Sequence, residues 1–181
     1  METLPLTPSL GWVKDAQNHL SKSDLMVFAD QPELTRYFGS VLMQYLTYHG
    51  NTEASPLYGK YINNLEDFLH QIGYAIPNQN ASLETLEDAR ELLSQNFTQP
   101  QNRFLIWFDA DYLLKVNEKL FKDIALMMNE ISVNNTEGGI LQRNALIMAN
   151  GNLNAVTSAY QLNDIGSLPL KTQLLNLKAE N

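Results

Sequence analysis

The sequence predicts an α/β fold, a three-layer sandwich with a mostly parallel sheet and a RecA-like or P-loop-type core that lacks the Walker A loop. Three nearly continuous apolar runs, residues 23–30, 103–110 and 144–151, are separated by helical segments and longer crossings. Strands that are apolar at successive positions are typical of parallel sheets covered by helices on both faces. The alternation of strand and helix along the chain then places the helices on those two faces.

The first half of the chain begins with two prolines in residues 1–10 and a short helical pattern over 11–20. We expect residues 1–22 to form an N-terminal arm with that helix, and residues 23–181 to form one α/β domain, since 181 residues suit a single core. The strand at 23–30 precedes a helix that starts at Pro32 and stops near Gly50. The segments that follow are a loop at 51–61 with a short strand near 57–62, and helices over 64–77 and 81–96.

The second half begins with the strand at 103–110 and continues into a helix that starts near Asn117. A turn at 134–139 and the strand at 144–151 follow, because Asn and Gly cluster in "NNTEGG" before the apolar run "NALIMANG". The remaining segments are predicted as an edge strand at 154–162 and a final short strand or helix at 167–178.

The net charge of the chain is −8, with 44% hydrophobic and 18% charged residues. An acidic surface repels phosphate backbones and anionic lipid, so we expect neither a nucleic-acid nor a membrane partner. No cysteine is present, no signal-peptide pattern opens the chain, and no stretch approaches the roughly 20 apolar residues of a membrane span. These features favour a cytoplasmic protein.

The segment "NRFLIWFDAD", residues 102–111, has the form of a Walker B strand, in which a carboxylate after the strand meets Mg²⁺. A phosphate-binding loop, G-x-x-x-x-G-K-[ST], should then follow the first strand. The corresponding segment, "ADQPELTR", has no glycine and no lysine, and it carries Asp30 and Glu33 where phosphates would lie. Pro32 also removes one N–H donor from the start of the helix. The sequence therefore predicts that this loop cannot hold a triphosphate.

Asp109 and Asp111 have two interpretations: carboxylate ligands of a metal ion, or a polar strand end that leads into the next helix. The second is favoured because no phosphate would share the metal. His19, His49 and His70 have no metal-ligand spacing, and no G-x-S-x-G elbow is present. The sequence thus predicts no catalytic residue, no metal site and no cofactor, and a protein that is not an enzyme.

Several segments resemble SulA, a family of bacterial cell-division inhibitors: "ADQPELTRYFGSVLMQYLTYHG", "SLETLEDARELL", "FLIWFDADYLLKVNEKLFKDIALMMNE" and "ALIMANGNLNAVTSAYQL". The resemblance covers about residues 23–165. It implies a RecA-like fold that has lost its phosphate loop. It also implies a protein that binds and sequesters FtsZ, and so blocks polymerisation and GTPase activity in the SOS response to DNA damage.

A partner-binding surface is expected around "SPLYGKYINN", where aromatic area and positive charge flank a glycine. The candidate contacts are Tyr58, Lys60 and Tyr61, followed by Arg36, Phe68 and Arg90. The alternative is that Tyr58 and Tyr61 merely cover a sheet edge.

Two other functions remain open at this point. One is a barstar-like immunity or inhibitor protein, because "YGKYINNLEDFLHQIG" and the segments after it follow a similar strand–helix order. The other is a degenerate nucleotide-binding protein that uses Asp109 and Asp111. The sequence also leaves a homodimer open.

Overall fold

The computed structural model of the chain describes residues 10–29, 31–48, 52–76, 82–94, 102–135, 142–149, 156–158 and 165–169. The strands are β1 (Leu25–Phe28), β2 (Thr52–Tyr58), β3 (Asn102–Phe108), β4 (Gln142–Ile147) and β5 (Gly166–Pro169). The helices are α1 (Leu10–Leu20), α2 (Pro32–Tyr48), the 3₁₀ helix η1 (Gly59–Tyr61), α3 (Leu65–Ala75), α4 (Leu86–Ser94), α5 (Asp111–Val116) and α6 (Glu118–Asn135).

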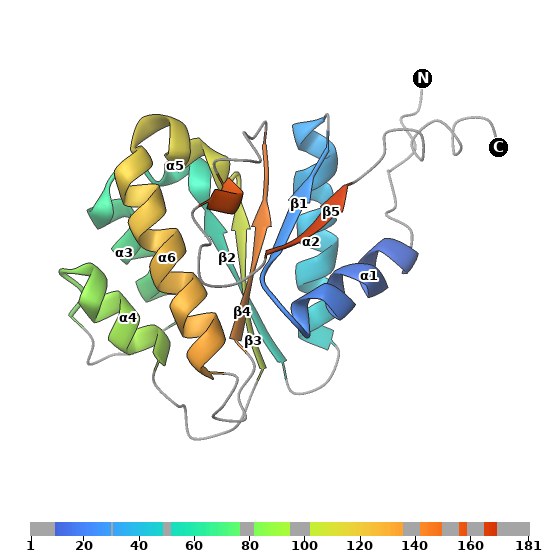
Figure 1. Ribbon diagram of the computed structural model, residues 1–181, viewed down its shortest axis with the longest axis horizontal. Coiled ribbons are helices and arrows are strands. Elements are labelled where there is room, and N and C mark those ends of the chain that lie inside the picture. The colour runs from blue at the N-terminus through green and yellow to red at the C-terminus, as the bar shows by residue number, and fades with distance from the viewer. Residues whose placement is uncertain are drawn as a thin grey trace.

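The strands form one sheet in the order β2-β3-β4-β1-β5. Every pairing in it is parallel: β1 lies between β4 and β5, and β3 lies between β2 and β4. Helices α1 and α2 cover one face, and α3 to α6 cover the other (Figure 1). The predicted fold class, a parallel sheet inside a three-layer α/β sandwich, is confirmed.

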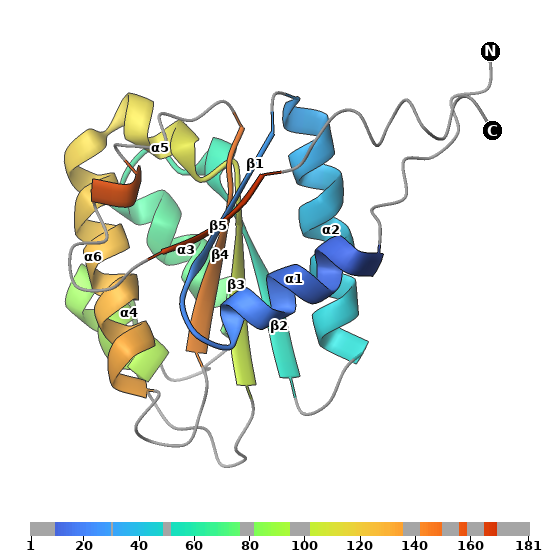
Figure 2. The ribbon, with the colours of Figure 1, turned by 45° about the vertical axis from the view of Figure 1, so that its right-hand side comes forward.

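Side chains of each central strand alternate between the two helical layers, as the pleat of a strand requires. In β3, Phe104, Ile106 and Phe108 pack with the residues of α1 and α2. Leu105 and Trp107 pack with the residues of α3, α4 and α6 instead. Figure 2 shows the sheet between the two layers. Both faces are therefore buried, which explains why this strand is apolar at successive positions from Phe104 to Phe108 rather than at alternate ones.

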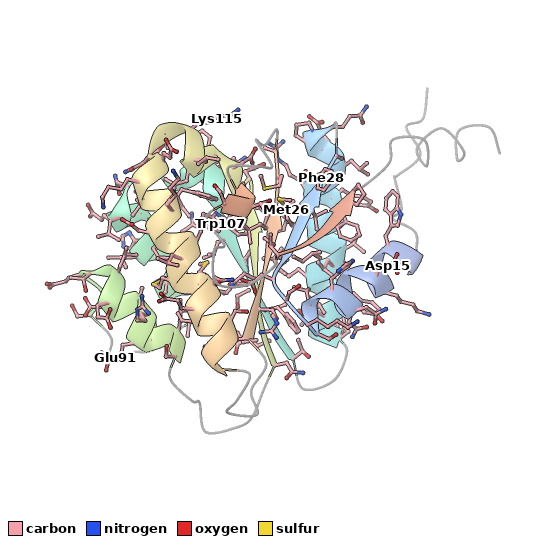
Figure 3. The ribbon with its side chains drawn as sticks, in the orientation of Figure 1. Asp15, Met26, Phe28, Glu91, Trp107 and Lys115 are labelled. Carbon is pink, nitrogen blue, oxygen red and sulfur yellow. The ribbon has the colours of Figure 1, made fainter. Side chains whose placement is uncertain are left out.

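The larger core lies on the side of α6. Trp107 is fully buried there, and its ring centroid lies 5.6 Å from that of Phe121 on α6. Figure 3 places Met26 and Trp107 in the interior, whereas the exposed residues Asp15, Glu91 and Lys115 lie on the outside. The interior is thus filled by large apolar side chains, which is the main stabilising term for a domain of this size.

A buried polar network ties the start of β1 to β4 and α6. One carboxylate oxygen of Asp24 accepts hydrogen bonds from the backbone N–H of Asn144 and from the hydroxyl of Ser132, both at 2.8 Å. The other accepts from the side-chain amide of Asn144 at 3.1 Å. Burial raises the pKa of Asp24 to about 6, against these hydrogen bonds and the charge of Arg143, which lower it.

Some elements differ from those expected. The segment 52–58, expected mainly as a loop, is the strand β2, and η1 follows it where the short strand was placed. The helix expected from Asn117 is α6, but a separate helix, α5, precedes it. In the segment 154–162, expected as an edge strand, residues 156–158 are helical and the other residues lie outside the described part of the chain.

The ends of the chain are described in part. Helix α1 buries Val13, Ala16 and Leu20 in the same core cluster as α2, so it packs on the α/β domain. In the segment 167–178, residues up to Pro169 belong to β5, and the rest lies outside the described residues. The arm at 1–9 and the turn from 136 onward lie outside them as well. None of the described helices has both the length and the apolar character needed to cross a bilayer.

Candidate functional site

The strands β1, β3 and β4 end at the same edge of the sheet, because they run parallel and neighbour one another. In open parallel sheets this carboxyl edge is where ligands bind, since the loops and the helix N-termini that follow the strands converge there. Five residues meet at this edge, and we call them the carboxyl-edge cluster: Arg36, Gly59, Asp109, Asp111 and Ala149.

Asp109 lies directly after β3 and has a backbone φ of 47°, in the left-handed region. Aspartate and asparagine tolerate this region better than most residues with a side chain. The backbone carbonyl of Asp109 accepts a hydrogen bond from the N–H of Tyr112 at 3.0 Å, which closes the turn into α5. The conformation holds the carboxylate at the edge of the sheet, where 5% of its side chain is exposed.

The carboxylate of Asp109 forms an ion pair with Arg36, in the second turn of α2. The Nε of Arg36 lies 2.9 Å from Oδ1 and 3.2 Å from Oδ2 of Asp109. The Arg36 side chain is 45% exposed, so one end of the pair is buried and the other reaches solvent. The pair joins the helix after the first strand to the turn after the third, across 73 residues of sequence. It supplies Asp109 with the positive charge that a buried carboxylate requires.

Asp111, the first residue of α5, is also buried, with 2% of the residue exposed. Its Oδ1 accepts a hydrogen bond from the backbone N–H of Ala149 at 2.7 Å. The N–H of Ala110 donates to the carbonyl of Ile147 at 3.1 Å. Both contacts fix the turn after β3 against the end of β4. The structure therefore places Asp109 and Asp111 at the polar end of β3, in the turn that leads into α5.

After β1, the described residues form the helix start that the sequence predicts. Helix α2 starts at Pro32 and carries Glu33 in its first turn. Thr35 donates its hydroxyl hydrogen to the carbonyl of Met148 at 2.8 Å, which anchors α2 to the end of β4. Asp30 lies outside the described residues. A proline and a carboxylate thus occupy the helix start that offers N–H groups to phosphate in a P-loop protein.

Gly59, in η1, lets a second loop approach this turn. A Cβ atom added to Gly59 would overlap the carbonyl oxygens of Asp109 and Phe108. The aromatic ring of Tyr58 stacks on that of Phe108, with centroids 5.8 Å apart and planes 17° apart. The Nζ of Lys60 lies 5.0 Å from the centroid of the Tyr61 ring. η1 therefore presents aromatic and basic side chains beside the carboxyl-edge cluster.

Four of the six predicted partner contacts lie at the carboxyl edge, and the other two lie on α3 and α4. Arg36, Tyr58, Lys60 and Tyr61 come together at the carboxyl edge, and Tyr58 and Tyr61 are 47% and 62% exposed. Phe68 is fully buried in the core on α3, so it offers no surface to a partner, and this prediction is corrected. Arg90 lies on α4, where it forms ion pairs with Glu130 at 2.6 Å and Glu87 at 3.3 Å.

Two features of the structure were not predicted from the sequence. The first is the ion pair between Arg36 and Asp109, because the contact depends on how β1 and β3 are placed in the sheet. The second is a cavity of about 790 Å³ between α3 and the segment before α4, where Gly73 interrupts an otherwise apolar helical face. None of the residues that line this cavity belongs to the carboxyl-edge cluster. Across the described residues, no three or more His, Asp or Glu side chains are grouped so as to hold a metal ion.

Neither a protein-family model nor a curated protein sequence matches the chain. Solved structures do match. One chain of Drosophila ORC bound to DNA superposes with a TM-score of 0.66 and 10% identity, over 83% of this chain and 38% of that one. The Aeropyrum pernix ORC2 protein in its ADP form gives 0.62 and 16%, over 99% and 53%. The Aeropyrum pernix ORC1 protein in complex with DNA gives 0.56 and 13%, over 97% and 50%.

This chain therefore spans between about a third and a half of the length of those structures. At such identities the likeness establishes the fold alone, a parallel α/β fold that the chain shares with those structures. The general RecA-like fold that the SulA resemblance implied is thus correct, whereas membership of the SulA family is not supported.

Two sequence-based predictions are contradicted by these comparisons. The prediction that the chain is not an enzyme is contradicted, because its structural neighbours include the ORC2 protein solved with ADP and with ADPNP. The partner prediction, FtsZ and no nucleic acid, is also contradicted, because the structural neighbours include ORC proteins solved in complex with DNA. Net charge describes the whole surface, whereas contacts with phosphate depend on local groups, so the charge of the chain alone does not exclude nucleic acid.

Proposed function

We propose that the chain is a degenerate nucleotide-binding protein, in which the Arg36–Asp109 ion pair takes the position that a magnesium ion and a phosphate group take in a P-loop hydrolase. Its carboxyl edge would keep one arrangement whether or not nucleotide is present. The observation that supports this proposal is the contact of Arg36 Nε with both carboxylate oxygens of Asp109, at 2.9 and 3.2 Å.

Arg36 and a metal ion would compete for the carboxylate of Asp109. In a P-loop hydrolase the aspartate after the third strand helps to hold Mg²⁺, which in turn bridges the phosphates. Here the guanidinium already neutralises Asp109, and only 5% of that aspartate side chain is exposed. A metal ion could reach these oxygens only by displacing Arg36, which would cost the charge-assisted hydrogen bonds of the pair. The side chain of Arg36 therefore does internally what a bound ion would do.

The consequence is a preorganised edge. The ion pair joins α2 to the turn after β3, and Asp111 joins that turn to the end of β4. A surface held in its binding conformation loses less conformational entropy when a partner docks. The exposed side chains beside it, Tyr58, Lys60 and Tyr61, are the groups that such a partner would meet.

Thermal unfolding with and without ligand tests the proposal. We expect millimolar ADP with Mg²⁺ to raise the melting temperature of the wild-type chain no more than ADP with EDTA does, because Asp109 is not free to bind the metal. In Arg36→Gln, Asp109 loses its cation, and we expect Mg²⁺ to restore part of the lost stability. Arg90→Gln, which removes an arginine from a different ion pair, is the control and should gain no response to Mg²⁺. A wild-type chain that is stabilised by ADP only in the presence of Mg²⁺ would overturn the proposal.

A second candidate function is contact with nucleic acid through η1. Exposed tyrosines next to a lysine resemble the stacking surfaces of proteins that bind single strands, in which aromatic rings meet bases and cations meet phosphates. The structural neighbours solved on DNA support this candidate. With a net charge of −8, binding should be weak and should fall steeply with salt. Fluorescence anisotropy with a labelled single strand tests it: Tyr61→Ser and Lys60→Gln should each weaken binding several-fold, and equal binding by the variants would reject it.

The cell-division role implied by the SulA resemblance, without FtsZ as its assigned partner, stays a prediction, and so does the barstar-like inhibitor role. Expression in a rod-shaped bacterium tests the first, because a division inhibitor would produce filaments. A pulldown with ribonucleases tests the second.

A further inference from the structure

We propose that the cavity between α3 and the segment before α4 is a docking site for a basic amphipathic peptide segment of a partner protein. The cavity has a volume of about 790 Å³, within the range of sites that take a ligand or several side chains. Its lining combines apolar side chains, two carboxylates and two rings: Leu65, Glu66, Leu69, His70, Gly73, Tyr74, Leu83 and Glu84. This site lies apart from the carboxyl-edge cluster, so the inference does not depend on the proposed function.

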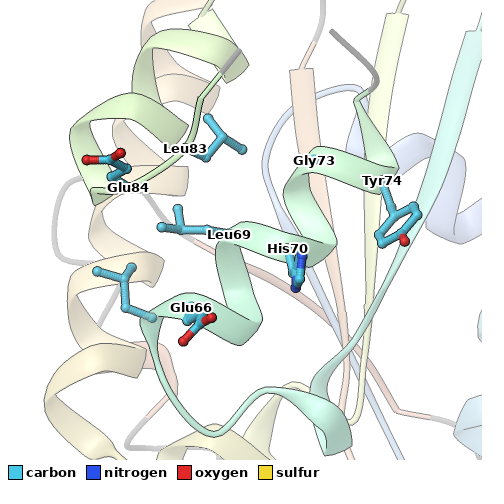
Figure 4. A pocket seen from close by; sticks show the side chains of 8 residues that line it. Glu66, Leu69, His70, Gly73, Tyr74, Leu83 and Glu84 are labelled. Atoms are coloured by element: carbon cyan, nitrogen blue, oxygen red, sulfur yellow. The ribbon is translucent and has the colours of Figure 1, made fainter. Parts of the chain in front are cut away.

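The floor of the cavity is apolar. Leu69 of α3 is almost fully buried, while Leu65 and Leu83 are partly buried and pack against the same core. Figure 4 shows Leu69 and Gly73 on α3 and Leu83 on the segment that leads into α4. Because part of this leucine surface remains open, an apolar side chain that entered the cavity would remove it from water.

Gly73 makes room for such a side chain. It lies inside α3, where glycine costs about 1 kcal/mol relative to alanine. A Cβ atom added to Gly73 would meet Leu83 Cδ1 at 3.8 Å, which is an ordinary contact; among the described residues outside α3, this is the contact found within 4 Å. The backbone therefore tolerates a side chain here. A larger residue at position 73 would extend into the cavity.

The rim of the cavity is negatively charged. Glu66 and Glu84 are both exposed, and neither forms an ion pair with a described residue. The complementary partner is cationic, because lysine or arginine side chains could reach these carboxylates while staying in contact with water.

Tyr74 supplies an aromatic contact beside the rim. It is 84% exposed, and its ring centroid lies 6.3 Å from that of His70. Exposed tyrosines next to an apolar cavity are frequent binding hot spots, because they offer a large rigid surface at a small entropic cost. An apolar floor, an acidic rim and an aromatic edge together match a helix with leucines on one face and lysines beside them.

A designed peptide tests this site. The probe is a labelled helix-forming peptide of about 16 residues, with Leu at helical spacing and Lys at the flanking positions. One comparison peptide has Glu in place of Lys, and the other has Ser in place of Leu. We expect only the Leu/Lys peptide to bind in fluorescence anisotropy. Absence of binding at about 100 µM, or equal binding of the Leu/Glu peptide, would overturn the proposal.

Variants of the chain locate the binding. Gly73→Leu places a side chain in the cavity and should weaken binding about 10-fold or more, while its helix propensity favours the fold. Glu66→Gln combined with Glu84→Gln should weaken binding several-fold and reduce its salt dependence, which keeps the test decisive if Gly73→Leu does not fold. Glu91→Gln removes an exposed acid of α4 outside the cavity and should leave binding unchanged. Wild-type affinity in folded Gly73→Leu would overturn the proposal.

Discussion

Replacing Arg36 measures how strongly its ion pair with Asp109 holds the carboxyl edge together. In Arg36→Gln, the carboxylate of Asp109 keeps its burial, with 5% of its side chain exposed, but loses its cation. A buried charge left without a partner costs about 3–5 kcal/mol when fully enclosed. Because the Arg36 side chain is 45% exposed, and water can replace part of its contact, we expect a loss of about 2 kcal/mol in the free energy of unfolding.

Asp109→Asn supplies the other half of a double-mutant cycle. Asparagine tolerates the φ of 47° at this position, so the substitution removes the charge without adding backbone strain. We expect it to cost about 1–2 kcal/mol, and the double variant to cost about 1–2 kcal/mol less than the sum of the single variants. Urea denaturation, analysed by linear extrapolation with equal slopes, gives these free energies.

The matched control is Lys122→Gln, which breaks the exposed i,i+4 pair with Glu118 on α6. Because both of its side chains are solvated, this change should cost less than about 0.5 kcal/mol. If the two single variants at the carboxyl edge were additive, or if Arg36→Gln cost no more than the control, the ion pair would not hold this edge together.

Burial of Asp24 makes the free energy of unfolding depend on pH. The pKa of Asp24 rises from 3.8 in the unfolded chain to about 6 in the folded one. The stability that this residue contributes is therefore complete below pH 3.8 and is lost as the pH rises to about 6. Urea denaturation between pH 4 and 7 should show this loss at about 1.4 kcal/mol for each pH unit relative to Asp24→Asn, and parallel curves for the two proteins would contradict it. Gly59→Ala should destabilise the chain by about 1–3 kcal/mol in the same assay, because its Cβ would overlap backbone oxygens of Phe108 and Asp109, and a neutral result would show that η1 can move away. Gly73→Ala should instead stabilise the chain by about 0.5–1 kcal/mol, and destabilisation there would mean that the cavity is not open at this position.

The central strands could be predicted from the sequence because each is buried on both faces. Strand β3 is buried from Arg103 to Phe108, and its residues from Phe104 onward form a continuous apolar run. Strand β4 is also buried along its whole length, but its apolar run begins only at Ala145, after three polar residues. Strand β2 could not be predicted in this way, since it lies at the edge of the sheet and most of its residues are half-buried. Its polar residues and Pro56 are tolerated at an edge but read as a loop.

Single residues of the candidate site could be predicted from the sequence, but the contacts between them could not. Asp109 was recognisable as the polar end of an apolar strand, and Arg36 as a basic residue near the start of a helix. Their contact depends on the order of strands in the sheet, which places β4 between β1 and β3, and local sequence does not encode that order. Phe68 was misassigned for a related reason, because an aromatic residue on an amphipathic helix can face either the core or a partner.

The most direct test of the ion pair is the NMR signal of the Arg36 Nε–H group in the wild-type chain. We predict a distinct resonance with slow solvent exchange, which is lost in Asp109→Asn and unchanged when ADP and Mg²⁺ are added, because the Asp109 oxygens stay with Arg36. Release of this Nε–H group on addition of Mg²⁺ and ADP would contradict the account, because it would show that the metal nucleotide takes Asp109 for itself.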